Sequence, residues 1–132
     1  MTHQHPNRIH AVLFGLSEDL AGELLKPLAK FCSHIQSLAA DRATEPLNRL
    51  PDSSSQVIFC GPDTEVVTKL RQTMPKAPIV VVSRHPEVSC WLDSIEAGAT
   101  DYCAAPFETS QMKWILETSF RSVQQQQAAS AA

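Results

Sequence analysis

Apolar positions along this chain alternate between short continuous runs and longer stretches with helical spacing. Short apolar runs predict strands at residues 8–14, 56–60 and 78–83, of which the last is continuously β-branched as in buried strands. A weak alternation at 34–39 and a short segment at 101–104 predict two further strands. Elsewhere apolar residues recur three or four positions apart, which predicts helices over residues 17–31, 45–50, 64–74, 86–97 and 108–123.

This regular alternation of strands and helices predicts the fold class. Strands joined through helices need right-handed crossovers, which produce a parallel sheet with helices on both faces. We therefore expect one doubly wound α/β domain over residues 8–123, with a flexible N-terminus at 1–7 and a disordered tail at 124–132. In such folds the functional crevice lies beyond the carboxyl ends of the strands.

Single residues indicate where two of the helices begin and end. Ser17 is placed to cap the first helix, and Pro27 predicts a kink or an early end near Lys26. Asp63 falls in the first turn of the third helix, where a carboxylate is stabilised by the helix dipole.

Composition narrows the range of functions. The 132 residues are 43% hydrophobic and 19% charged with a net charge of −3, which fits one soluble domain. No cluster of Lys and Arg indicates nucleic-acid binding, and no apolar stretch approaches the ~20 residues of a membrane span. The start of the chain lacks the apolar core of a secretory signal, so we expect a cytoplasmic protein.

The sequence contains no arrangement typical of an enzyme or a cofactor site. Its four cysteines are far apart and form no Cys-x-x-Cys pair, so neither zinc nor disulfides are expected. No Gly-rich nucleotide loop is present either, and we expect no catalytic activity, no cofactor and no bound metal.

The segment PIVVVSRHPEVSCWLDSIEAGATDYCAAPF, residues 78–107, resembles the receiver domains of response regulators, the CheY-like family. The pieces EAGATDY and PF are the most specific parts, and a weaker likeness extends over residues 8–123. The resemblance implies a flavodoxin-like (βα)5 sheet with strand order 2-1-3-4-5. It also implies a role in bacterial two-component phosphorelay signalling, in which an aspartate accepts a phosphoryl group.

Most of the family's phosphorylation residues are replaced in this chain. Family members hold Mg²⁺ with an acidic pair, phosphorylate an aspartate, and use a hydroxyl and a lysine to complete the pocket. The resemblance places these positions on Leu13, Phe14, Cys60, Ser83 and Ala105. Only the hydroxyl of Ser83 matches, and the loop after Cys60 is shorter than usual. The resemblance therefore predicts a pseudo-receiver that binds no Mg²⁺.

Two further positions carry the family's switch. Ser83 and Tyr102 match the residues that couple phosphorylation to rotation of an aromatic ring. The alternative is structural, with Ser83 ending a strand and Tyr102 packing its ring while its hydroxyl stays at the surface. The bond before Pro106 corresponds to one that is cis in the family.

We therefore expect a stand-alone pseudo-receiver that binds a protein partner, or forms a homodimer, without phosphorylation. The resemblance points to the face of the fourth helix, fifth strand and fifth helix, with contributions from Val88, Trp91, Ile95, Tyr102 and Ile115. Core packing is the alternative for the three aliphatic residues. Leu92 is expected to supply the inward contact of the fourth helix, and Trp114 is a second candidate anchor.

Two other functions compete with this one. Cys60 stands where the family has its reactive carboxylate, which suggests a thiol-based redox sensor. Asp63 is the nearest carboxylate to that position, so a conventional phosphorelay receiver with a displaced acceptor is the third possibility.

Overall fold

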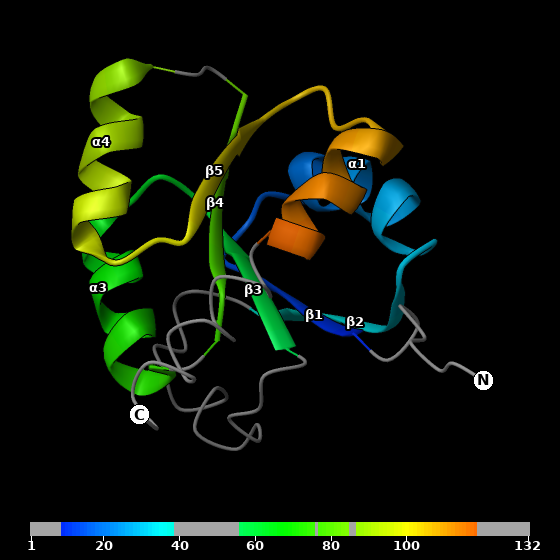
Figure 1. Ribbon diagram of the computed structural model, residues 1–132, viewed down its shortest axis with the longest axis horizontal. Helices are drawn as coiled ribbons and strands as arrows, with labels where there is room; N and C mark the ends of the chain where they lie inside the picture. The colour runs from blue at the N-terminus through cyan, green and yellow to red at the C-terminus, as the bar shows by residue number, and fades with distance from the viewer. Residues whose placement is uncertain (1–8, 39–55, 76, 85–86, 119–132) are drawn as a thin grey trace.

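The computed structural model describes residues 9–38, 56–75, 77–84 and 87–118. Five parallel strands form one sheet in the order β2-β1-β3-β4-β5 (Figure 1). The strands are β1 (Ile9–Phe14), β2 (Cys32–Leu38), β3 (Gln56–Cys60), β4 (Ile79–Ser83) and β5 (Asp101–Ala104). The predicted fold class and strand order are confirmed.

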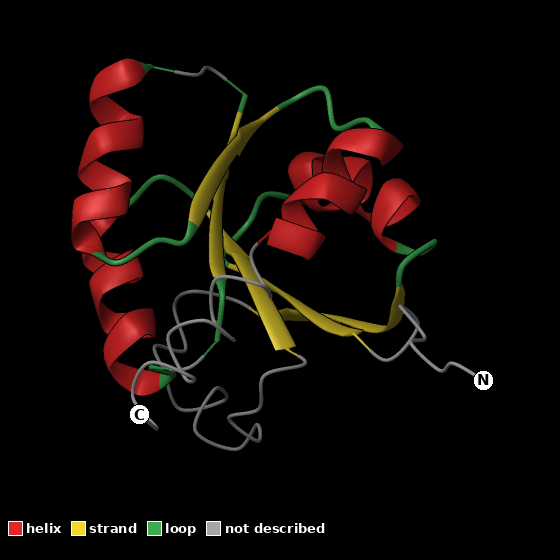
Figure 2. Cartoon of the chain, viewed as in Figure 1, coloured by secondary structure: helices red, strands yellow, loops and turns green. Residues whose placement is uncertain are grey.

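Helices cover both faces of this sheet (Figure 2). One face carries α1 (Glu18–Leu28) and a helix over residues 109–118, whereas the other carries α3 (Thr64–Thr73) and α4 (Val88–Ala97). Within the described part of the chain, no helix is long and apolar enough to cross a membrane.

The strands separate two buried clusters because successive side chains point to opposite faces. Leu13 and Phe59 belong to the cluster under α1 and the helix over 109–118. Phe14 and Cys60, their neighbours in sequence, belong to the cluster under α3. Adjacent residues at a strand end therefore lie on opposite sides of the sheet, which decides which of the predicted pocket residues meet.

Two predicted boundaries differ from the structure by two residues. The first helix, expected to kink or end early near Lys26, continues through Pro27 and ends at Leu28. A proline in the last turn removes one backbone donor, while the amide of Ala29 still bonds to the carbonyl of Leu25 at 2.9 Å. The second strand begins at Cys32, two residues earlier than expected.

The prediction for Ser17 agrees with the structure, whereas Asp63, expected in the first turn, lies one residue before it. The Ser17 hydroxyl accepts a hydrogen bond from the amide of Leu20 at 3.3 Å, and Asp63 precedes α3 as its N-cap. The expected helix over 45–50 and the expected terminal segments 1–7 and 124–132 lie outside the described residues.

Candidate functional site

The carboxyl ends of β1 and β3 place an aromatic ring beside a thiol. Phe14 and Cys60 are direct partners in the β1–β3 register, and Cys60 is paired with Val81 on its other side. Phe14 is 3% exposed and Cys60 is fully buried. The position that resembles a phosphoacceptor is thus enclosed by hydrocarbon.

The other positions of the expected pocket are only partly brought together. Ser83 is buried at the end of β4, and its carbonyl accepts a hydrogen bond from the amide of Ala105 at 2.9 Å. The Ala105–Pro106 bond is cis, the geometry that the resemblance implies. Leu13 lies in the cluster on the opposite face, so it does not share a surface with Cys60.

These side chains do not fit a magnesium-dependent phosphoryl acceptor. Mg²⁺ takes oxygen ligands, chiefly carboxylates and waters, whereas Leu13, Phe14 and Cys60 offer none. Ala105 supplies no cation to balance the charge of a phosphoryl group. Nor do three or more His, Cys, Asp or Glu side chains converge anywhere in the described residues.

Asp63, the nearest carboxylate in sequence, caps α3. Its Oδ1 accepts hydrogen bonds from the amides of Glu65 at 3.0 Å and Val66 at 3.4 Å. These amides belong to the first turn of the helix and have no partner within it. The structure therefore gives Asp63 a structural task at the helix end.

Burial makes the thiol of Cys60 a poor nucleophile. Desolvation, with a smaller contribution from the charge of Asp63, raises the pKa of Cys60 to about 12. The reactive form of cysteine is the thiolate, which is scarce at neutral pH when the pKa is this high. Cys103 also has a pKa raised to about 12, and it lies in the cluster on the opposite face of the sheet.

Tyr102 is turned inward. Its residue is paired with Val81 in the β4–β5 register, and its ring packs against the cluster under α3. The hydroxyl oxygen is buried and has no hydrogen-bond partner among the described residues. The expectation that this hydroxyl would remain at the surface is wrong, because the ring packs against the cluster under α3 and the hydroxyl is buried with it.

The outer side of α4 carries four large apolar side chains in solvent. They occupy positions i, i+3, i+4 and i+7 of the helix and are Val88, Trp91, Leu92 and Ile95. Their exposed fractions are 69%, 46%, 51% and 39% respectively. We call these four residues the α4 stripe.

Small residues hold the inner side of the same helix. Ser94 is fully buried, and Cys90 and Ala97 are half-buried. The prediction that Leu92 points inward is therefore wrong, and the spacing of Cys90, Ser94 and Ala97 at i, i+4 and i+7 is the signal that was missed. Small side chains allow a helix to lie close to its neighbours, which leaves the larger ones outside.

The helix over residues 109–118 contributes less to the expected interaction face than the sequence predicted. Ile115 is 3% exposed and packs into the cluster under α1, so it does not reach solvent. Its helix presents Met112, Ile115 and Leu116 to the core at the usual spacing. Trp114, in contrast, is 63% exposed.

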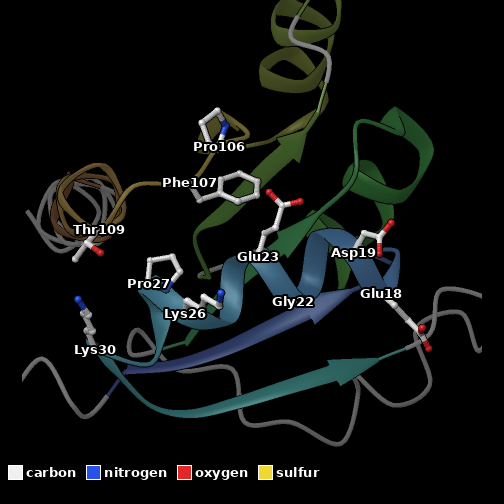
Figure 3. Close-up of a pocket in the computed structure, with 10 residues that line it drawn as sticks. All are labelled: Glu18, Asp19, Gly22, Glu23, Lys26, Pro27, Lys30, Pro106, Phe107 and Thr109. Carbon is white, nitrogen blue, oxygen red and sulfur yellow. The ribbon is translucent and has the colours of Figure 1, made fainter.

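A groove lies between α1 and the segment that follows β5 (Figure 3). The α1 side carries both signs of charge, contributed by Glu18, Asp19, Glu23, Lys26 and Lys30. Phe107 and Pro106 form the opposite side, and Glu23 makes an ion pair with Arg84. The sequence did not reveal this groove, because α1 and Phe107 are far apart in the chain. The apolar residue directly after Pro106 was the one local sign that this segment packs against another element.

Comparisons with solved structures identify the fold. The chain is similar to the beryllofluoride-activated NtrC4 receiver domain dimer, with 15% identity, a TM-score of 0.70, and coverage of 86% of this chain and 98% of that one. It is also similar to a putative response regulator from Chloroflexus aurantiacus, with 21% identity, a TM-score of 0.67, and coverage of 86% and 99%.

A third match is the signal receiver domain of an HD domain-containing protein from Pseudomonas fluorescens Pf-5. It has 13% identity and a TM-score of 0.75, and the match covers 97% of this chain and 96% of that one. No family model and no curated protein sequence matches the chain. At these identities the likeness establishes that the chain has the fold of response-regulator receiver domains.

Proposed function

We propose that this chain is a pseudo-receiver that acts in signal transduction by binding another protein, without phosphorylation, through the α4 stripe. Tyr102 and Ile115, which the resemblance also placed on this face, pack against the two buried clusters and are not part of the stripe. The observation that carries the proposal is the orientation of α4, whose small side chains face the core while four large apolar ones face solvent. Large aromatic and aliphatic side chains exposed together are typical of interaction sites.

The chemistry of the strand ends supports independence from phosphorylation. A buried thiol stands at the position that resembles the acceptor, and apolar side chains stand where the resemblance requires carboxylates. The solved structures with this fold include one described as an activated receiver domain dimer, so association through a receiver fold has a precedent. Here the associated state would not need the phosphoryl group.

The two alternatives have weaker support. Redox sensing by Cys60 needs an accessible thiolate, and this thiol is buried with a raised pKa. Phosphorylation at Asp63 would cost α3 its cap, because the same carboxylate oxygen accepts two amide hydrogen bonds.

The test compares two exposed tryptophans. We expect Trp91→Gln to lose the protein partners or the self-association of the wild type, measured by affinity capture and light scattering without acetyl phosphate. Trp114→Gln, which removes an equally large side chain from another helix, should retain them. A Trp91→Gln variant with unchanged partners and unchanged oligomeric state would overturn the proposal.

A further inference from the structure

The border of the α4 stripe is acidic. Glu96 follows Leu92 by one turn and lies about 40° from it around the helix axis, and Asp93 lies a further 60° or so around the helix, on the same flank. Both carboxylates are exposed. Glu87, also exposed, stands at the amino end of the helix as its N-cap residue. Since α4 itself contains no Lys or Arg, every charge that the helix contributes beside the stripe is negative.

Two basic residues of the described part of the chain, Arg71 and Arg84, are engaged elsewhere. Arg71 of α3 directs its guanidinium at backbone carbonyls, including that of Gly98 at the end of α4. Arg84 makes its ion pair with Glu23 of α1. Within the described part of the chain, Asp93 and Glu96 take part in no ion pair. Their charges are therefore available to a partner.

From this arrangement we infer that the occupant of the α4 stripe is an amphipathic helix of another protein, with basic residues beside its apolar face. Apolar anchors at i, i+3, i+4 and i+7 match the way two helices pack along one another. Lys or Arg beside those anchors would pair with Asp93 and Glu96. This inference rests on the proposed function and names the chemistry of its partner.

Charge also decides against a second copy of the chain as the occupant. Two α4 helices laid along one another would bring two sets of Asp93 and Glu96 to the same interface. Like charges at an interface oppose association, and here no cation of α4 compensates for them. A basic helix satisfies both the apolar stripe and its border.

The experiment uses two synthetic helical peptides with the same apolar spacing. One carries Lys beside the apolar positions, and the other carries Glu at the same places. Binding to the full chain is measured by fluorescence anisotropy at low and moderate salt. We expect the Lys peptide to bind about five- to tenfold more tightly than the Glu peptide at low salt, with a smaller difference when salt screens the charges.

Three variants separate the contributions. Trp91→Gln should weaken both peptides, because it removes the central apolar anchor. The double variant Asp93→Asn with Glu96→Gln should bind both peptides equally, because it removes the border charge and keeps the stripe. Glu18→Gln with Asp19→Asn, a matched change on α1, should leave the preference for the Lys peptide unchanged.

The outcomes distinguish this inference from the proposed function. Equal affinity of the wild type for the two peptides would overturn the basic partner. The basic partner would also be overturned if neither peptide bound and the wild type self-associated in a way that Trp91→Gln abolished. That result would still support the α4 stripe as an interface. Peptide binding that Trp91→Gln leaves unchanged would contradict the inference, while the capture experiment above decides the proposed function separately.

Discussion

Arg71 of α3 donates two hydrogen bonds to the carbonyl oxygen of Gly98, from Nε at 3.0 Å and from Nη2 at 2.9 Å. Its Nη1 donates to the carbonyl of Ala77 at 2.8 Å, and its Nη2 also reaches the hydroxyl of Thr100 at 3.2 Å. That hydroxyl accepts a further bond from the amide of Ile79 at 3.0 Å. One guanidinium therefore connects α3, the end of α4 and the beginnings of two strands.

We expect Arg71→Lys to lower the free energy of unfolding by about 2 kcal/mol, because one ammonium cannot replace the fork that serves several carbonyls. Denaturant unfolding measures the change. Lys69→Gln, an exposed position on the same helix, should stay within about 0.5 kcal/mol of the wild type. Equal stability of the two variants would contradict the proposed importance of Arg71.

Gly98 is expected to resist replacement. Its φ is 123°, and an added Cβ would lie 3.1 Å from the Cβ and Cγ of Arg71. Gly98→Ala should therefore cost about 2 kcal/mol of stability, measured by thermal or denaturant unfolding. Gly22→Ala is the control, because it lies within α1 with open space around it and should stabilise by about 0.5–1 kcal/mol. A Gly98→Ala variant as stable as the wild type would refute this account.

Replacement of Ser94 is expected to raise the stability of the fold, whereas replacement of Gly98 is expected to lower it. Ser94 is fully buried on the inner side of α4, and its hydroxyl has no hydrogen-bond partner among the described residues. Ser94→Ala should raise the free energy of unfolding by about 1 kcal/mol, since it removes an unsatisfied polar group. Ser89→Ala on the exposed side of α4 reports helix propensity alone and should stabilise less, by about 0.5 kcal/mol. Destabilisation by Ser94→Ala would show that the hydroxyl is satisfied.

The thiols should differ in reactivity. Burial raises the pKa of Cys60, so we expect it to stay unmodified by a maleimide at about pH 8 while the protein is folded. Cys90 on α4 is half-buried and should react first. Peptide mass spectrometry reads both sites, and labelling in denaturant serves as the control. Labelling of Cys60 as fast as Cys90 would favour the redox alternative.

The partly buried position of His10 leads us to expect a loss of stability in mild acid. Burial, and next the neighbouring charge of His34, lower the pKa of His10 below its ordinary value of 6.5, although a hydrogen bond with Gln36 opposes them. The two rings stand edge to face with their centroids 4.7 Å apart. Below pH 6.5 the unfolded chain therefore binds more protons at this site than the folded one, so stability falls as the pH decreases.

Denaturant unfolding at several pH values between about 7.5 and 5.5 tests this sign. His10→Gln should lose less stability than the wild type over that range, because its side chain does not titrate. A wild type that becomes more stable relative to His10→Gln on acidification would contradict the assignment.

The sequence predicted the centre of the sheet well because β1, β3 and β4 are short apolar runs. The run QVIFC became β3 with unchanged bounds, Ser17 caps α1 as expected, and Asp63 lies one residue before its expected place in the first turn of α3. Two residues of the EAGATDY segment have a structural role, because Gly98 and Thr100 accept hydrogen bonds from Arg71. That contact joins residues 27 and 29 positions apart, so local patterns could not reveal it.

The face of α4 was harder to predict. A helix with both a small-residue stripe and a large apolar stripe has two candidate inner sides, and hydrophobicity favours the wrong one. Leu92 was expected to be buried, yet Ser94 occupies the inner position. The choice depends on how closely α4 can approach its neighbours, which is a property of the packed structure. Ile115 was predicted on the interaction face for a related reason. In the structure its side chain packs into the core instead.

Phosphorylation independence is the central claim, and one measurement tests it most directly. Beryllofluoride with Mg²⁺ mimics the phosphorylated state of an active receiver, and amide spectra of the full chain report binding residue by residue. We expect no saturable change at the strand ends around Phe14, Cys60 and Ser83. A saturable, Mg²⁺-dependent shift of those amides would contradict the account and return Asp63 to consideration as the acceptor.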